Sequence, residues 1–491
     1  MFIGIDVGTT GTKSIIVDDK GDIVQYSYKG YDCFFPAPNH VEQNIEDILN
    51  VIIETVRDCV SKIENQNMIE SLSVSVQSGT MVPYNENKQT YGPAITWQDS
   101  RCGKEAEKLL DQYGINYFYK KTGWRLGASL NFIQIYRITN NPGEKKYTHY
   151  LSVSDCVTKL LTGEYYTDLN SAGNSQLLNI HLGKWDPDLL NIAGISERQL
   201  GKLLPPGSFI GTIRKDTAEK MGLNENVKIY LGAQDQFCSA ISAGVLKPGD
   251  AMFSTGTSWV MMAVTEKPEF ETSSFPSIMK HVVSDFFTSY TFIPAGGSAL
   301  KWLKNNILYE KEQYEKVSYD EIVDAAISIS PGAEGLFFFP QLAGTAYPTW
   351  NEKVKGAFIG LDFIHNRKHI IRSVLEGLAY EINISIKRLE KQGIRINNIF
   401  GLGGATRNRN WMQIVCDIME KPIIISNFSD MAPMGAAMIA AVGCGKFPDY
   451  YSSYCAFGLQ EKQKLYLPGK NKNIYRDLFA QYEDAYNKRC I

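Results

Sequence analysis

The chain has 491 residues, of which 44% are hydrophobic, so it can bury large apolar cores and is expected to form two or three domains. Lysine plus arginine number 50 and aspartate plus glutamate number 53. Because positive charge does not exceed negative charge, the chain would release few counterions from a nucleic acid and would bind it weakly. The same balance of charge disfavours binding to an anionic membrane. We therefore expect a small-molecule partner, with neither nucleic acid nor membrane.

The first strand-like segment, Phe2–Asp6, is followed by a glycine- and threonine-containing turn and by a second strand-like segment, Ser14–Val17. From Ile45 to Val60 the apolar residues recur at the spacing of one helix face. A strand-rich opening that passes into an amphipathic helix predicts an α/β fold.

The turn between the first two strands suits a phosphate. Gly8, Thr9 and Thr10 offer backbone N–H groups and hydroxyls, and Lys13 can add a charge. Asp6 ends the strand, where its carboxylate could hold Mg²⁺ through water. The alternative is a hairpin whose glycines serve backbone geometry alone. A Walker A motif is excluded because it would need glycine at Thr12.

The strand–turn–strand pattern occurs a second time, half a chain later. Ala251–Ser254 and Trp259–Val264 are strand-like and flank Thr255–Ser258. Two such turns could grip a polyphosphate from opposite sides of a cleft, so a nucleotide is indicated. Glycine and proline near 243–249 predict the boundary between two domains, residues 1–244 and 245–491.

Further downstream, Ile370–Ile382 has helical periodicity and Ile396–Leu402 is strand-like, ending at Gly403-Gly404. This segment misses the dinucleotide fingerprint Gly-x-Gly-x-x-Gly because Thr406 is not glycine.

Neither a membrane span nor an oxidising compartment is indicated. The nine cysteines contain no C-x-x-C pair, and Asp6 precedes any apolar leader segment. The longest run of small apolar residues, near Met434–Val442, is too short to cross a bilayer. We expect a cytoplasmic protein, with a homodimer as the base-rate assembly.

The sequence resembles the FGGY carbohydrate kinases, a family that includes kinases of xylulose, ribulose and glycerol. The resemblance covers most of the chain, in the family's order. Its motifs are Asp6–Thr10, Trp97–Arg101, Leu161–Glu164 with Thr167-Asp168, Gly232–Gln236, Ser254–Ser258, Gly335–Pro340, Leu375–Gly377, and Gly403–Ala405 with Asn408 and Trp411. It implies an α/β fold of two actin-like (ribonuclease H-like) ATPase domains flanking a central cleft, with ATP and Mg²⁺ as cofactors. Residues 1–244 would bind the sugar and residues 245–491 the nucleotide.

The resemblance also implies roles for individual residues. Asp235 is the catalytic base, which takes the proton of the acceptor hydroxyl as its oxygen attacks the γ-phosphate, and Gln236 touches substrate hydroxyls. Without the family, such an aspartate would more often be a helix N-cap. The implied ATP-binding residues are Gly8, Thr9, Thr10, Lys13, Gly256, Thr257, Gly297, Gly404 and Asn408.

The substrate residues leave more than one alternative. Trp97 could offer a flat face to a polyol while Asp99 and Arg101 bind its hydroxyls, or Trp97 could be core and the other two an ion pair. Ser78-Gly79 stands where glycerol kinases have Arg-Glu and xylulokinases Met-His. Gln236 is similar to the glycerol kinases, and Gly344–Tyr347 replaces a usual Gly-Glu-Arg.

We expect in-line phosphoryl transfer to a ketopentose such as xylulose, with ribulose, glycerol, erythritol or another ketose as alternatives. In this hypothesis, Asp6 and Asp235 come from opposite lobes of the protein and meet around the triphosphate. A rival of another class is a non-catalytic or filament-forming actin-like ATP-binding protein, which would share both phosphate loops.

Overall fold

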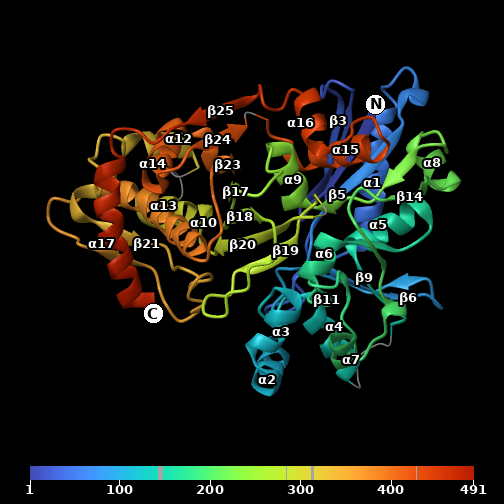
Figure 1. Cartoon of the computed structure of the whole chain (residues 1–491), viewed down its shortest axis with the longest axis horizontal. Coiled ribbons are helices and arrows are strands. Elements are labelled where there is room, and N and C mark those ends of the chain that lie inside the picture. Colours follow the sequence, from blue (N-terminus) through green and yellow to red (C-terminus); the bar gives the residue numbers. More distant parts are fainter. Residues whose placement is uncertain (142–146, 284, 311–314, 427, 491) are drawn as a thin grey trace. The chain divides into compact units, whose positions relative to one another are not determined.

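The computed structural model describes residues 1–141, 147–283, 285–310, 315–426 and 428–490 (Figure 1). They form two compact units. Unit 1 contains Met1–Leu246 together with two later segments, Ile278–Phe287 and Asp430–Glu461. Unit 2 contains the other described residues, which begin at Lys247. Every motif of the resemblance therefore falls within one of the two units.

Unit 1 is built on a seven-stranded sheet ordered β14-β15-β5-β1-β2-β3, with β16 also paired to β5. Strands β1 and β2 are antiparallel, as are β2 and β3, whereas β1 runs parallel to β5. The bounds are β1 Phe2–Val7, β2 Gly11–Val17, β3 Ile23–Gly30, β5 Ser71–Val76, β14 Phe209–Thr212, β15 Lys228–Tyr230 and β16 Ala233–Gln234.

Unit 2 repeats this arrangement. The strands of its sheet include, in order, β20, β18, β17, β23, β24 and β25. Strand β17 is antiparallel to β18 and parallel to β23, which is in turn parallel to β24. The bounds are β17 Asp250–Thr255, β18 Trp259–Thr265, β20 Phe287–Ile293, β23 Asn398–Leu402, β24 Ile423–Ser426 and β25 Gln463–Tyr466. The strand–turn–strand repeat seen in the sequence is therefore the start of a duplicated α/β sheet, as expected for the actin-like fold class.

The other elements of unit 1 cover this sheet or form smaller sheets. Helix α1 spans Ile45–Val60, as its apolar spacing predicted, and its inward residues are buried against the sheet. The further bounds are β4 Glu42–Gln43, η1 Gln66–Met68, β6 Met81–Asn85, β7 Thr90–Tyr91, β8 Ala94–Ile95, α2 Gly103–Tyr113, α3 Ile115–Thr122, α4 Asn131–Asn140, β9 His149–Ser152, α5 Val153–Thr162, β10 Tyr166–Asp168, α6 Leu169–Asn174, β11 Leu178–Asn179, β12 Lys184–Trp185, α7 Pro187–Ala193, η2 Glu197–Gln199, β13 Lys202–Leu204, α8 Lys215–Met221, α9 Asp235–Ala243, α15 Met431–Gly443 and α16 Tyr450–Ala456.

The helices of unit 2 pack around one large apolar core. The longest is α13, Arg367–Lys391, whose middle turns are buried throughout. The further bounds are α10 Gly297–Leu303, η3 Lys304–Leu308, α12 Tyr319–Ala325, η4 Ala333–Gly335, β21 Phe337–Phe339, β22 Ala357–Ile359, η5 Gly404–Arg407, α14 Arg409–Met419 and α17 Lys472–Cys490; β19, Ser277–Lys280, begins where unit 2 passes into the 278–287 segment of unit 1.

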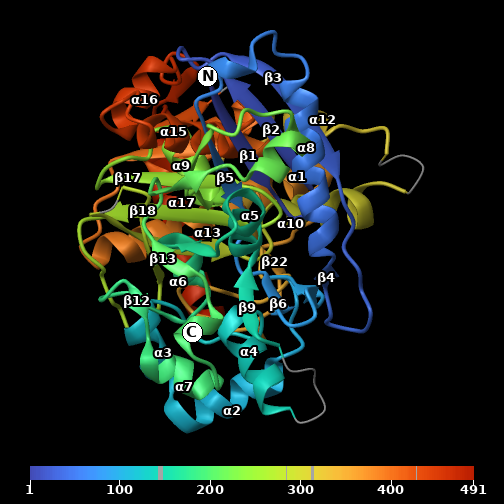
Figure 2. The same cartoon turned by 90° about the vertical axis from the view of Figure 1, so that its right-hand side faces the viewer.

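Helix α15 is the small-apolar run of the sequence, and it packs inside unit 1 (Figure 2). A Cβ atom added at Gly4 of β1 would lie 1.9 Å from the carbonyl oxygen of Pro433, and one added at Gly435 would lie 1.9 Å from that of Cys238 in α9. Glycine is required at both contacts because backbone meets backbone. Across the described residues, no helix is long and apolar enough to span a bilayer.

The predicted domain boundary stays a prediction, but the division into compact units differs from a single cut at residue 244. The units change at Leu246, and α15 with α16 belongs to the first unit although both follow residue 400. A boundary placed from glycine and proline cannot detect a segment that returns to an earlier unit.

Candidate active site

The predicted residues of unit 1 follow the ends of three neighbouring strands. The last paired residues are Val7 of β1, Val76 of β5 and Gln234 of β16, and they stand beside one another in register. The turn at Gly8, the segment from Gln77 and the first residue of α9, Asp235, therefore leave the sheet at one edge. Ligands of open α/β sheets bind at this carboxyl edge of parallel strands.

Asp6 and Asp235 share this edge and act on each other electrostatically. Burial, with a smaller contribution from the Asp6 carboxylate, raises the pKa of Asp235 to about 7. Burial also raises the pKa of Asp6 to about 6, against a hydrogen bond of 2.9 Å donated by the Ser75 hydroxyl. A carboxyl poised near neutrality is what a general base needs. Both residues belong to unit 1, so the expectation that they come from opposite lobes is wrong.

Asp235 is not the N-cap of α9, because the helix begins with it and Gln234 is the preceding cap residue. Its Oδ1 accepts a hydrogen bond of 2.7 Å from the backbone N–H of Gln236. Its Oδ2 forms no hydrogen bond with any residue that the structure describes, so it can accept a proton. Gln236 follows it in the first turn of the helix.

The turn between β1 and β2 is closed tightly. Gly8 donates its backbone N–H to Gly11 at 3.1 Å and accepts the Tyr31 hydroxyl on its carbonyl at 2.5 Å, while Thr10 at the tip is exposed. Lys13 lies opposite Asp6 in the β1–β2 pair, and its Nζ is 3.3 Å from Asp430 Oδ1. Part of the lysine charge is therefore already compensated inside unit 1.

Trp97 is not a core residue. Its side chain is 46% exposed, and its indole Nε1 donates to the Thr9 hydroxyl at 3.2 Å. Gly79 adopts φ +77°, and a Cβ there would lie 3.1 Å from the Trp97 Cβ and 3.3 Å from Asn174 Nδ2. The same Asn174 amide donates to Ser78 Oγ at 3.1 Å. The structure thus brings together three of the predicted substrate residues, Ser78, Gly79 and Trp97.

Two buried glutamines, which the sequence did not single out, support this cluster. Gln77 Oε1 accepts the Thr9 hydroxyl at 3.1 Å, and Gln77 Nε2 donates to Gln43 Oε1 at 2.8 Å. Gln43 Nε2 closes the ring by donating to the Thr9 carbonyl at 2.7 Å. Because the Thr9 hydroxyl also accepts the Trp97 indole N–H, this network holds the turn after β1 and the exposed ring in fixed positions relative to each other.

Asp99 and Arg101 form the ion pair that was the alternative to substrate contact. Asp99 is fully buried, and the Arg101 guanidinium reaches it at 2.6 Å and Glu42 at 2.7 Å. The same Asp99 oxygen, Oδ2, also accepts the Val41 backbone N–H at 2.7 Å, and Oδ1 accepts the Arg101 backbone N–H at 3.0 Å. With no exposed oxygen left, Asp99 positions the segment that carries Trp97.

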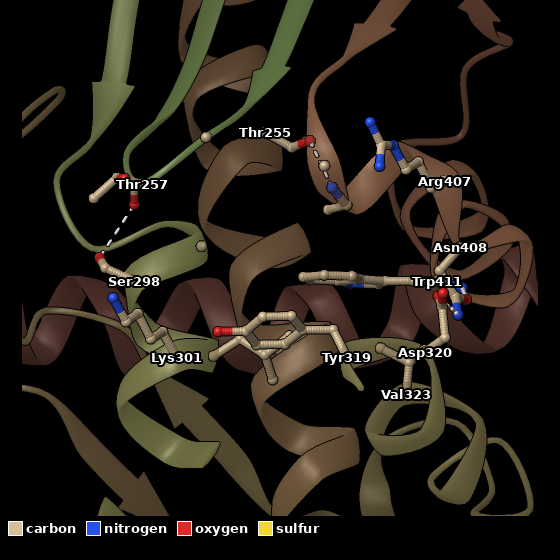
Figure 3. A pocket seen from close by; sticks show the side chains of 15 residues that line it. Thr255, Thr257, Ser298, Lys301, Tyr319, Asp320, Val323, Arg407, Asn408 and Trp411 are labelled. Atoms are coloured by element: carbon tan, nitrogen blue, oxygen red, sulfur yellow. Dashed lines mark hydrogen bonds between the residues drawn. The ribbon is translucent and has the colours of Figure 1, made fainter. Parts of the chain in front are cut away.

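The predicted nucleotide residues of unit 2 line one cavity of about 610 Å³ (Figure 3). Gly256, Thr257, Gly297, Gly404 and Asn408 all contribute to its wall. They come from the turn after β17, from α10 and from the segment after β23, the counterparts of the strand ends in unit 1. The cavity is large enough for most of a nucleoside.

The two ends of this cavity differ in character (Figure 3). Thr257, Ser298 and Lys301 stand at one end and offer hydroxyls and a cation to phosphates. At the other end Asn408 donates to Asp320 at 2.8 Å and caps α14 by accepting the Trp411 backbone N–H at 3.0 Å. The sequence did not single out Asp320 or Lys301.

Gly297 lets α10 approach the turn after β17. Its backbone N–H donates to the Gly256 carbonyl at 3.0 Å, and the next residue, Ser298, donates to the Thr257 carbonyl at 3.1 Å. A Cβ at position 297 would lie 2.5 Å from that Gly256 oxygen. Backbone must therefore move if any side chain is added.

Replacement of Gly297 by alanine is expected to raise KM for the nucleotide about tenfold or more, because the displaced turn carries Thr257. Steady-state kinetics at saturating sugar measures it. Gly103→Ala is the matched control, since a Cβ there meets no atom within 4 Å. An unchanged nucleotide KM in Gly297→Ala would show that this turn does not hold phosphates.

The acidic edge of unit 1 fits a hydrated divalent cation better than a protein-made metal cage. No group of three or more His, Cys, Asp or Glu side chains able to hold a metal occurs among the described residues. The Asp6 carboxylate nevertheless opposes the ionisation of Asp235, because it adds to the effect of burial in raising the pKa of that residue. A cation with few protein ligands would relieve this repulsion, which is how Mg²⁺ is usually held beside phosphates.

Two sheets of the same strand order, each with a glycine- and threonine-rich turn after its first strand, define an actin-like phosphotransferase class. Family models agree with this class over most of the chain. Residues 1–242 match the N-terminal domain and residues 251–444 the C-terminal domain of the FGGY family of carbohydrate kinases. The chain belongs to the FGGY family and is a carbohydrate kinase, which sets aside the non-catalytic alternative.

Individual relatives share moderate identity over nearly their whole length. A xylulose kinase of Bacillus subtilis (strain 168) is 29% identical over 487 residues, which is 99% of this chain and 96% of that protein. A gluconokinase of the same organism is 28% identical over 459 residues, covering 91% and 88%. The crystal structure of ligand-bound xylulose kinase from Lactobacillus acidophilus matches with a TM-score of 0.90 at 23% identity, covering 99% and 98%. This last match confirms the predicted fold class.

Proposed function

We propose that this kinase transfers the γ-phosphate of ATP to a hydroxyl of a neutral ketopentose of the xylulose type. The observation that carries the choice of substrate is the charge of the predicted substrate residues. Arg101 is the one cation among those six residues, and Asp99 and Glu42 already neutralise it. Gluconate would bring a carboxylate that needs a free cation, whereas a ketopentose needs hydroxyl partners and an apolar face.

In this proposal Asp235 takes the proton of the acceptor hydroxyl through its unpartnered Oδ2, while Gln236 orients the substrate beside it. Thr10 and Thr257 donate hydrogen bonds to phosphate oxygens and thereby stabilise charge on the transferred group. Asp6 would hold Mg²⁺ through water, and the bound ion would neutralise part of the phosphate charge. Transfer requires the terminal phosphate to reach the hydroxyl at Asp235, and no phosphoenzyme is formed.

A panel of acceptors tests the substrate. Xylulose, ribulose, glycerol, erythritol and gluconate are offered with ATP and Mg²⁺, ADP release is followed, and the product mass is checked. We expect the highest kcat/KM for xylulose. The highest kcat/KM for gluconate would refute the argument from charge, and ADP release without phosphorylation of any acceptor would refute the assigned reaction.

Trp97 is expected to contribute binding rather than chemistry. Trp97→Ala should raise KM for the sugar about tenfold, because the exposed ring covers the carbon face of the substrate. Trp97→Phe keeps an aromatic face but loses the hydrogen bond to Thr9, so its KM should rise less. Initial rates at saturating ATP provide both values. If both variants keep the wild-type KM, Trp97 lies outside the substrate site.

A further inference from the structure

A second cavity of about 570 Å³ lies in unit 2, and none of its lining residues lines the nucleotide cavity. Its wall combines the last turn of α13 and the residue after it with two loops, one near Ser273 and one near Thr349. None of these residues has a role in the proposed reaction. The cavity is therefore a feature that phosphoryl transfer does not explain.

Two cations line this cavity from the end of α13. Arg388 and Lys391 are three residues apart and so lie on one face of the helix. Neither forms an ion pair with a carboxylate among the residues that the structure describes. Glu271 also lines the wall, but its carboxylate accepts the Ser273 backbone N–H at 2.7 Å, and this bond lowers its pKa. The balance of charge in the cavity is positive.

Buried polar atoms beside the cavity lack partners. Arg388 Nε, a donor, and Gln392 Oε1, an acceptor, are both buried without a hydrogen bond among the described residues. The other amide group of Gln392 is used, because its Nε2 donates to Ser274 Oγ at 3.0 Å and to the Tyr347 hydroxyl at 3.2 Å. Unpaired buried polar groups in native proteins generally have a water, ion or ligand to meet.

We propose that this cavity binds a phosphate dianion, either free or as the monoester of a polyhydroxy compound. Arg388 and Lys391 supply charge-assisted donors, and Ser273 and Thr349 line the same cavity. The Thr349 hydroxyl already donates to the Thr345 hydroxyl at 2.8 Å. Gln392 Oε1 would accept from a ligand hydroxyl. Cations in the last turn also complement a helix dipole. The dipole alone leaves the cavity and its unpaired donor and acceptor unexplained.

Calorimetric titration of the full chain tests this site, with inorganic phosphate and ribose 5-phosphate as probes and with ADP saturating the nucleotide cavity. We expect one saturable site for a probe, weakened about tenfold or more by Lys391→Glu, because a charge-assisted contact becomes repulsive. The matched control is Lys368→Glu, the same change on α13 about 35 Å away. Gln392→Leu should weaken ribose 5-phosphate more than inorganic phosphate if the ester is the ligand.

Arg388→Gln should also weaken the probe, and Arg388→Lys, which keeps the charge, should restore part of the binding. This pair matters because Arg388 also donates to Asn487 at 3.3 Å and a neutral residue there could disturb packing. Kinase activity at saturating substrates should be unchanged in Lys391→Glu. The proposal is overturned if neither probe binds saturably, or if Lys368→Glu weakens binding as much as Lys391→Glu.

Discussion

Replacement of Asp235 by asparagine is expected to lower kcat by about 10²- to 10⁴-fold, because the amide cannot take the proton of the attacking hydroxyl. The Kd for ADP should stay within about threefold of wild type, since the cavity proposed for the nucleotide is lined by residues of unit 2 alone. Turnover at saturating sugar and ATP gives the first value, and calorimetry gives the second.

Asp111→Asn is the matched control for this variant, because Asp111 is exposed on α2 and lies in no predicted site. It should keep wild-type turnover. An Asp235→Asn enzyme that retained more than about a tenth of wild-type kcat would show that another group serves as the base. Loss of nucleotide binding together with turnover would point to a folding defect, which a thermal melt would reveal.

The same substitution is expected to stabilise the fold at alkaline pH. The folded-state pKa of Asp235 is about 7, above its ordinary value of 3.8, so the folded protein binds more protons than the unfolded chain between those values. Stability is therefore greatest at the acidic end of this window and falls as pH rises through 7. Asparagine avoids this loss. We expect the free energy of unfolding of Asp235→Asn to exceed that of wild type by about 1–3 kcal/mol at pH 8, and the difference to nearly vanish at pH 4.

Thermal melts of Asp235→Asn, Asp111→Asn and wild type at pH 4 and pH 8, without nucleotide or divalent cation, measure this difference. Activity should show the opposite trend in wild type, rising as pH increases through 7, because the base must be ionised. A melting temperature of Asp235→Asn that stayed level with wild type at pH 8 would mean that burial does not raise the pKa of this carboxyl.

Local features of the sequence predicted the fold well. The helix from Ile45 to Val60 and the strands on either side of Gly8 followed from periodicity and turn residues, which act over short distances. The repetition of strand, turn and strand at Thr255 revealed the duplication. Neither pattern carries information on which distant segments share a core, so the placement of α15 in unit 1 was not predictable.

The candidate site was predicted in its motifs but not in its supporting residues. Asp235 and Thr257 stand in motifs of the family, whereas Gln43 and Gln77 are ordinary glutamines in β-rich segments. Their function arises from hydrogen bonds to Thr9, and these depend on three-dimensional distances that spacing in the sequence does not encode. Asp99 and Arg101 show the converse. A charged pair near a site gives the same sequence pattern whether it contacts the substrate or forms a structural ion pair.

The close fit of α15 under β1 has a consequence for how the protein is made. The strand that carries Asp6 is synthesised before the helix that covers Gly4, and more than 420 residues separate the two. Until α15 has been synthesised, the apolar face of the unit 1 sheet that this helix covers stays exposed, and unit 1 cannot complete its folding. A gene fragment ending at Leu246 would thus encode a domain without α15, whose sheet keeps an exposed apolar face. We expect that this half of the enzyme cannot be produced as a soluble protein.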